Sequence, residues 1–231
     1  LYPQPPEFEE HGRLAYWLYS FYPRYASGLP EDLRFSFRTQ FRTLKFEGGS
    51  PNTLLIFYDL SKTNCLWVLR PDDAGDPELP RITAEAIRAA NPALIFPQPV
   101  SDDYPPHDLF GSEPEHSWCY FFQKADLARQ FENWERVAEL GDQARQAGLS
   151  PSNTSSNAPH EWRPFIEGYA HVGRWDEARQ LTLQAAEKGE RYLVWLCRVW
   201  EQMGEGMEGN LQWMEQIHQT RAEMNCQKLG F

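Results

Sequence analysis

The sequence has no methionine before Met203 and no long apolar run, and both absences bear on where the chain belongs. Its four methionines lie at positions 203, 207, 214 and 224, and the first residue is Leu1. We therefore expect a region that begins partway through a longer protein, with a processed N-terminus as the alternative. No window approaches the roughly 20 apolar residues of a membrane span, and the first residues lack the order of a signal peptide. The segment itself is predicted to be soluble.

Positive charge is also scarce. Lys and Arg number 22 against 33 Asp and Glu, which gives a net charge of -11. Binding to a nucleic-acid duplex needs a concentrated cationic surface. We therefore expect no nucleic acid among the partners of this chain.

Cysteine is sparse and lacks a metal-binding pattern. Cys65, Cys119, Cys197 and Cys226 form neither a CxxC pair nor the dense arrangement of a disulfide scaffold. Buried free thiols are the expected state, and a pairing of Cys197 with Cys226 stays open. Motifs of the GxSxG and HExxH types and phosphate-cradling glycine loops do not occur either. We predict no catalytic residue, no cofactor and no metal ion for this segment.

The first hundred residues mix helix and strand patterns. Apolar residues recur at helical spacing in residues 7–28, and a second, shorter helix is predicted at residues 82–91. Alternating or short apolar runs, bounded by turn residues, predict strands at 33–41 with a possible extension over 43–46, at 53–59, at 65–71 and at 93–96. The short turns between the first three strands indicate an antiparallel meander.

The remainder of the chain is predicted to be helical. A segment rich in proline and aspartate, residues 101–114, separates residues 1–100 from residues 115–231. After it, apolar residues recur every three or four positions, and glycine or turn residues divide the pattern into six helices in three pairs. The predicted fold class is thus α+β: a helix and a small antiparallel sheet, followed by an all-α domain.

An internal echo connects two of these helix pairs. The stretch NWERVAEL at residues 133–140 is echoed by RWDEARQL at residues 174–181, so that Trp175 follows Trp134 by 41 residues. The second copy, which ends at Gly189, resembles a tetratricopeptide repeat, and the similarity extends over residues 115–217. The period of such arrays is about 34 residues, and the polar insertion at residues 149–159 accounts for the excess.

The tetratricopeptide resemblance implies a peptide-binding groove, because stacked helical hairpins leave a curved surface lined by their first helices. By the family's pattern, seven residues of the first two hairpins face that groove: Phe122, Asp126, Arg129, His160, Arg163, Glu167 and His171. An ordinary packed helical domain without a ligand is the alternative.

Two stretches together carry a wider resemblance. NTLLIFYDLSKTNCLWVLRP and, later, EPEHSWCYFFQKADLARQFENWERVAELGDQARQAG are similar to the soluble C-terminal regions of bacterial membrane proteins of the glycosyltransferase 39 or mannosyltransferase-like type. In that family the chemistry belongs to the membrane part. The resemblance therefore implies a non-catalytic accessory domain, attached to the membrane through a missing N-terminal part and facing the extracytoplasmic side.

A rival prediction gives the first hundred residues a role in binding or processing carbohydrate. Asp72, Asp73 and Asp76 form the densest acidic cluster, although a solvated loop is the preferred explanation for them. Trp67 alternates with Leu66 and Val68 along its strand, so we expect it to be exposed and available to a glycan.

Overall fold

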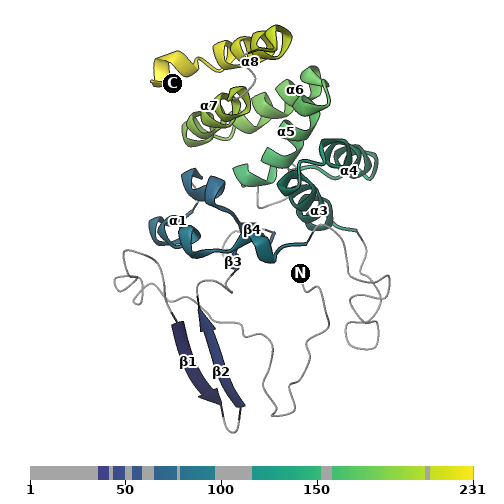
Figure 1. Ribbon diagram of the computed structural model, residues 1–231. Coiled ribbons are helices and arrows are strands. Elements are labelled where there is room, and N and C mark those ends of the chain that lie inside the picture. Colours follow the sequence, from purple (N-terminus) through teal and green to yellow (C-terminus); the bar gives the residue numbers. More distant parts are fainter. Residues whose placement is uncertain are drawn as a thin grey trace. The chain divides into compact units, whose positions relative to one another are not determined.

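The computed structural model describes residues 36–41, 44–49, 54–58, 65–76, 79–96, 116–151, 158–205 and 209–230 (Figure 1). These residues belong to two compact units. The first contains the strands and the short helices up to residue 96, and the second contains the later helices together with Tyr58, Cys65, Leu66 and Asp76. The predicted helix at 7–28 and the predicted connector at 101–114 lie outside the described residues.

The strands of the first unit form two antiparallel pairs. Strand β1 (Ser36–Phe41) pairs with β2 (Leu44–Gly49), and β3 (Leu55–Phe57) pairs with β4 (Trp67–Leu69). The predicted extension of the first strand over 43–46 is wrong, because β2 runs back along β1. The described strands also do not form one meander, since β2 and β3 are not hydrogen-bonded to each other. Local alternation identifies a strand but does not identify its neighbour.

Short helical turns complete the first unit. They are η3 (Pro71–Gly75), α1 (Arg81–Ala86), η4 (Ile87–Ala89) and η5 (Pro92–Leu94). The helix predicted at 82–91 is confirmed in outline by α1 and η4. The strand predicted at 93–96 is wrong, because the Asn91 side chain accepts a hydrogen bond from the Ala93 amide at 3.1 Å and starts a 3-10 turn there.

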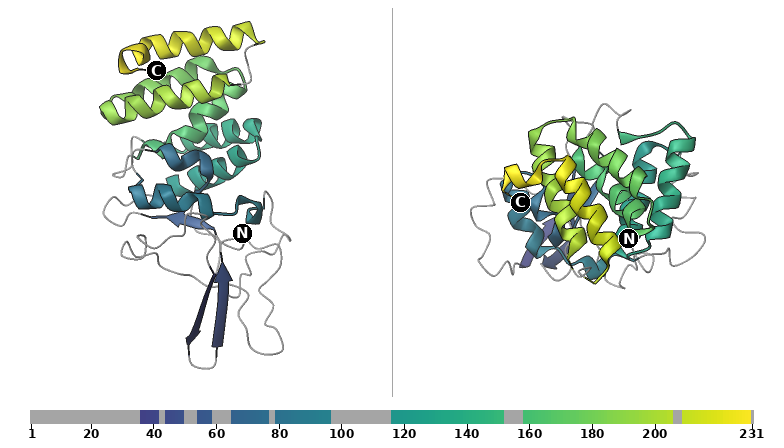
Figure 2. Two further views of the ribbon diagram at one scale, coloured as in Figure 1. Left: turned by 60° about the vertical axis from the view of Figure 1, so that its left-hand side comes forward. Right: turned by 90° about the horizontal axis from the view of Figure 1, so that it is seen from above.

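The second unit contains the six helices expected after residue 115. They are α3 (Trp118–Gln130), α4 (Trp134–Gln146), α5 (Arg163–His171), α6 (Trp175–Ala186), α7 (Glu190–Gly204) and α8 (Leu211–Glu223), with the short turns η7 (Pro159–Glu161) and η8 (Cys226–Leu229). Each helix packs against the next, so that the unit is a stack in sequence order (Figures 1 and 2). The α+β class is therefore correct, with helix predominating.

The backbone repeats with the same offset as the sequence. Helix α5 is followed two residues after its last residue by Gly173, whose φ is 77°, and the next amide, of Arg174, donates to the Tyr169 carbonyl at 2.8 Å. Glu132, 41 residues earlier in the sequence, has a φ of 55°, and the next amide donates to the Ala128 carbonyl at 3.0 Å. Both ends are the left-handed helix cap that normally takes glycine. The first copy therefore has the same backbone conformation at this position as the second, although it has Glu132 where the second has glycine.

Close helix packing forms the core of the second unit. Gly168 lies so near α4 that an added Cβ would collide with the Val137 side chain. Trp200 of α7 is fully buried, and its indole N–H donates to the Thr182 hydroxyl of α6 at 3.0 Å. A small residue and a satisfied polar contact thus join successive hairpins.

All four cysteines are paired, which overturns the expectation of free thiols. One disulfide joins Cys65 to Cys119, and the other joins Cys197 to Cys226. The second pairing is the one that the sequence left open. The first joins residues 54 positions apart that belong to different predicted domains, so no local spacing could indicate it.

Candidate functional site

The seven predicted groove residues lie on α3, on α5 and on the turn that precedes α5. Phe122, Asp126 and Arg129 share one face of α3 because they follow one another at intervals of four and three residues. The ring of Phe122 meets the ring of His160, with centroids 5.6 Å apart. The structure therefore brings the predicted residues of the first two hairpins into contact.

Four of these residues form a charged cluster, which we define as Asp126, Arg129, Arg163 and Glu167. Arg129 Nε donates to Asp126 Oδ1 at 2.9 Å, and its Nη1 lies 3.5 Å from Glu167 Oε2. Arg163 Nε donates to the other oxygen of Glu167 at 2.7 Å. Two positive and two negative charges balance, so the cluster is neutral as a whole.

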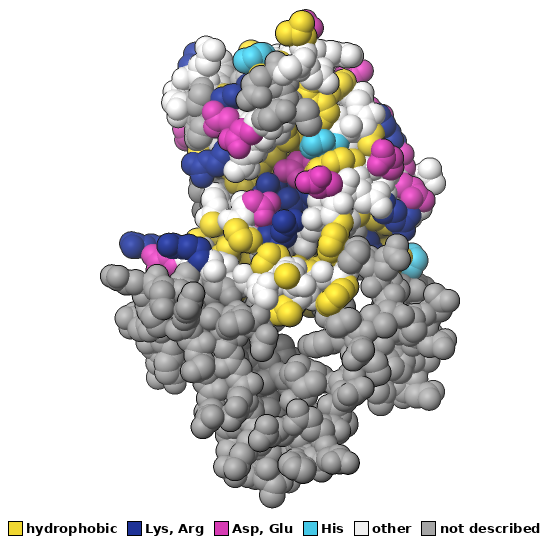
Figure 3. Space-filling model, in the orientation of Figure 1, with side chains coloured by type: hydrophobic (Ala, Val, Ile, Leu, Met, Phe, Trp, Pro, Cys, Tyr) yellow, Lys and Arg dark blue, Asp and Glu magenta, His cyan; other side chains and the backbone are white. Residues whose placement is uncertain are grey.

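The side chains of the charged cluster are buried more deeply than contact with a bound peptide would require. Its side chains are only 4–8% exposed. Charged side chains gather in a hollow of the face shown in Figure 3, among hydrophobic ones. Burying charges is costly unless they are paired with good geometry, and here the partners come from two different hairpins. The cluster consequently fixes α3 against α5 and leaves only its edges to solvent.

The seven predicted groove residues form a strip along α3 and α5, and an aromatic group adjoins it. The imidazole of His171 stacks on Trp134, with centroids 3.9 Å apart, and lies 4.9 Å from the Trp213 ring. Trp213 in turn meets Trp175 edge-on at 4.8 Å. Burial lowers the pKa of His171 below its usual value, while the charge of Glu167 opposes that shift. His171, Trp134 and Trp175 are half-buried, so this group is the accessible end of the strip.

Sequence reasoning missed Glu161, a fully buried carboxyl group. Its Oε2 accepts a hydrogen bond from the Trp118 indole at 2.5 Å, and its Oε1 accepts one from the Cys65 amide at 3.4 Å. Burial raises the pKa of Glu161 to about 7, although both hydrogen bonds favour the ionised form. No local pattern marks the residue, because its partners lie 43 and 96 positions away in the chain.

Glu161 is part of an attachment that holds Cys65 and Leu66 on α3. The disulfide to Cys119 fixes one residue, and the Gln123 side chain donates to the Leu66 carbonyl at 3.2 Å. With the bond from the Cys65 amide to Glu161, a covalent bond and two hydrogen bonds anchor this segment.

Trp67 does not provide the exposed ring predicted for a glycan. It is 2% exposed, whereas Leu66 is 50% exposed. Trp67 and Leu69 form the buried face of β4. The orientation prediction failed because Leu66, Trp67 and Val68 are all apolar, so alternation alone could not say which face is inside.

The three acidic residues proposed for carbohydrate processing, Asp72, Asp73 and Asp76, also make structural contacts or are buried. Asp73 is 1% exposed and accepts a hydrogen bond from the Arg70 amide at 2.8 Å, which closes the turn η3. Asp72 lies 3.8 Å from the Arg70 guanidinium, and Asp76 is buried. Across the described ranges, no three His, Cys, Asp or Glu side chains are grouped so that they could hold a metal ion.

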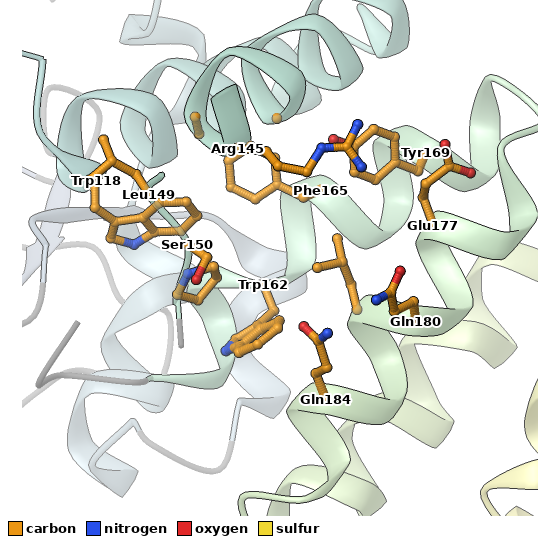
Figure 4. Close-up of a pocket in the computed structure, with 14 residues that line it drawn as sticks. Trp118, Arg145, Leu149, Ser150, Trp162, Phe165, Tyr169, Glu177, Gln180 and Gln184 are labelled. Carbon is orange, nitrogen blue, oxygen red and sulfur yellow. The ribbon is translucent and has the colours of Figure 1, made fainter. Parts of the chain in front are cut away.

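A cavity of about 250 Å³ lies within the second unit, between α4, α5, α6 and the segment after α4 (Figure 4). Its lining residues are Trp118, Gly141, Ala144, Arg145, Leu149, Ser150, Pro151, Trp162, Phe165, Tyr169, Glu177, Gln180, Leu181 and Gln184. None of the seven predicted groove residues lines this cavity, whose lining comes from α3, α4, α5, α6 and the start of the insertion after α4.

Comparison with known proteins does not extend this description. No family model, no curated protein and no solved structure matches the chain. Among the helices that the structure describes, none has the length and apolar character needed to cross a membrane.

Proposed function

We propose that this chain is a non-catalytic interaction module that binds a peptide segment along α3 and α5. The observation that carries the proposal is the strip of seven predicted groove residues, which is buried over most of its length and becomes accessible at His171 and the aromatic group beside it. Phe122 and His160 occupy one end, the charged cluster occupies the middle, and His171 with Trp134 occupies the other end.

The tetratricopeptide resemblance supports this proposal. The helical hairpins follow one another in a stack, and the first two share a sequence echo and a left-handed helix end with the same offset. A stack of that kind offers an extended surface along its first helices, because each hairpin contacts only its neighbours. Half-buried aromatic residues next to paired charges are typical of surfaces that proteins use for binding.

We further propose that the module belongs to a membrane protein of the glycosyltransferase-like type and faces the extracytoplasmic side. The two disulfides support this location, since disulfides persist in oxidising compartments and are rare in the cytosol. Their positions fit a structural role, because each joins a short segment to a helix: Cys65 to α3, and Cys226 of η8 to α7.

Peptide display tests the binding proposal. The full chain, with its disulfides oxidised, is used to select binders from a displayed dodecapeptide library, and selected peptides are synthesised and titrated by calorimetry. His171→Ala should weaken binding by roughly tenfold, because it removes an aromatic contact at the accessible end of the strip. His218→Ala, which removes an exposed histidine on α8, should leave binding unchanged.

Two outcomes contradict the proposal. One is a library selection that yields no specific peptide. The other is a peptide whose affinity is the same for the native chain, for His171→Ala and for Arg163→Ala, provided that thermal unfolding shows both variants folded. Either result would mean that the strip only holds the hairpins together.

A further inference from the structure

The cavity beside α6 has a composition that the peptide-binding proposal does not explain. Trp118, Leu149 and Ser150 lie on one side of it, and Gln180 and Gln184 of α6 lie on the other, with Trp162 between them (Figure 4). Its volume of about 250 Å³ exceeds the roughly 150 Å³ that suffices for a benzene molecule. It is smaller than the roughly 300–1,000 Å³ of a site for a drug-sized ligand. The cavity therefore fits a single substituted ring.

Gln180 and Gln184 are the polar groups that decide the ligand's chemistry. They lie one helical turn apart on α6, so both carboxamides point toward the same cavity. No other side chain in the described ranges is hydrogen-bonded to either of them. A purely apolar ligand would displace the water around these carboxamides and could not replace the hydrogen bonds that water makes to them, which is unfavourable. The ligand must therefore carry hydrogen-bonding groups along one edge.

The charges at the cavity are already neutralised. Arg145 lies 2.9 Å from Asp142, and Glu177 lies 2.8 Å from Arg174. An anionic or cationic ligand would have to compete with these pairs. An uncharged ligand would not.

We propose that this cavity binds one uncharged saccharide ring, such as a hexose at the end of a glycan. A pyranose presents hydroxyl groups at its edge, which Gln180 and Gln184 can bind as donors and acceptors. Its C–H faces are apolar and match the apolar part of the lining, which includes Leu149, Leu181 and Trp162. The site is distinct from the strip on α3 and α5, since none of the seven predicted groove residues lines it and both glutamines come from α6.

Titration of the full chain with small sugars tests the proposal. Methyl glycosides of glucose, mannose and galactose, together with N-acetylglucosamine, are titrated by calorimetry and by saturation-transfer NMR. Tryptophan fluorescence reports on the site, because Trp118 and Trp162 line the cavity. At least one sugar should bind saturably, and Gln184→Ala or Gln180→Ala should weaken that binding by roughly tenfold. Gln212→Ala, at an exposed position on α8, is the matched control and should have no effect.

Three results would overturn the proposal. The first is that none of the four sugars shows saturable binding. The second is that a sugar binds equally to the native chain and to both glutamine variants. The third is that N-acetylphenylalanine amide binds in the cavity while the sugars do not, which would make it a pocket for a partner's side chain. Peptide binding on the other helices is measured separately, so its failure would not affect this test.

Discussion

The stability of the native chain should decrease between about pH 4.5 and pH 7, and replacing Glu161 by glutamine should abolish this pH dependence. The native carboxyl group is completely buried, and burial raises its pKa from 4.5 to about 7. In this range the folded chain retains a proton that the unfolded chain has released, so the free energy of unfolding falls as the pH rises. The stabilisation is fully present below pH 4.5 and is lost as the pH rises through 7.

The size of the effect follows from the shift in pKa. One pKa unit corresponds to about 1.4 kcal/mol, so the carboxyl group should change the free energy of unfolding by roughly 3 kcal/mol between the two limits. Glutamine has nearly the same shape but does not titrate. Its amide can accept only one of the hydrogen bonds from Trp118 and Cys65, so the variant also carries a cost that does not change with pH.

Urea unfolding followed by tryptophan fluorescence from pH 4.5 to pH 8, with the disulfides oxidised, measures this difference. The free energy of unfolding of the native chain minus that of Glu161→Gln should decrease with pH. Glu215→Gln replaces an exposed glutamate on α8 and should reproduce the native profile. A difference that stays constant or increases with pH would refute the reasoning, because it would mean that Glu161 is already ionised in the folded chain at acidic pH.

Three further predictions concern the helical unit. Glu132→Gly should raise the free energy of unfolding by roughly 1 kcal/mol, because Glu132 has a φ of 55° that costs an L-residue about that much. Gly173→Ala should lower it by a similar amount, and thermal unfolding by circular dichroism measures both; a destabilised Glu132→Gly would contradict the assignment of strain. Replacing Cys197 and Cys226 together by serine should cost about 3–4 kcal/mol, the loop entropy expected for residues 29 positions apart. Equal urea midpoints for this variant and the native chain would show that the disulfide adds no stability.

The helices could be predicted from the sequence because their determinants are local. Apolar spacing marked all six helices of the second unit, and Gly173 marked the end of α5. The strand pairs and the orientation of Trp67 could not be predicted, since they depend on which residues face a distant partner. The sequence around Trp67 is apolar on both sides, so either face could have been the buried one.

For the predicted groove residues, the sequence indicated the helix faces on which they lie but not their contacts with one another. The repeat pattern grouped Asp126, Arg129, Arg163 and Glu167, and the structure brings them together. The ion pairs among these four residues could not be predicted, because they depend on the distance between α3 and α5. Glu161 gave no signal at all, since its environment is made by the fold and not by its neighbours in the chain.

The disulfide between Cys65 and Cys119 closes a covalent ring that contains the whole segment between them. Within this ring lie β4, α1 and the boundary at which the sequence changes from mixed to helical character. A single protease cut anywhere between residues 66 and 118 would open the ring without releasing either piece. On a denaturing gel the cleaved chain would migrate as one molecule until a reductant separates it into two, so integrity under non-reducing conditions is a poor measure of an uncut backbone.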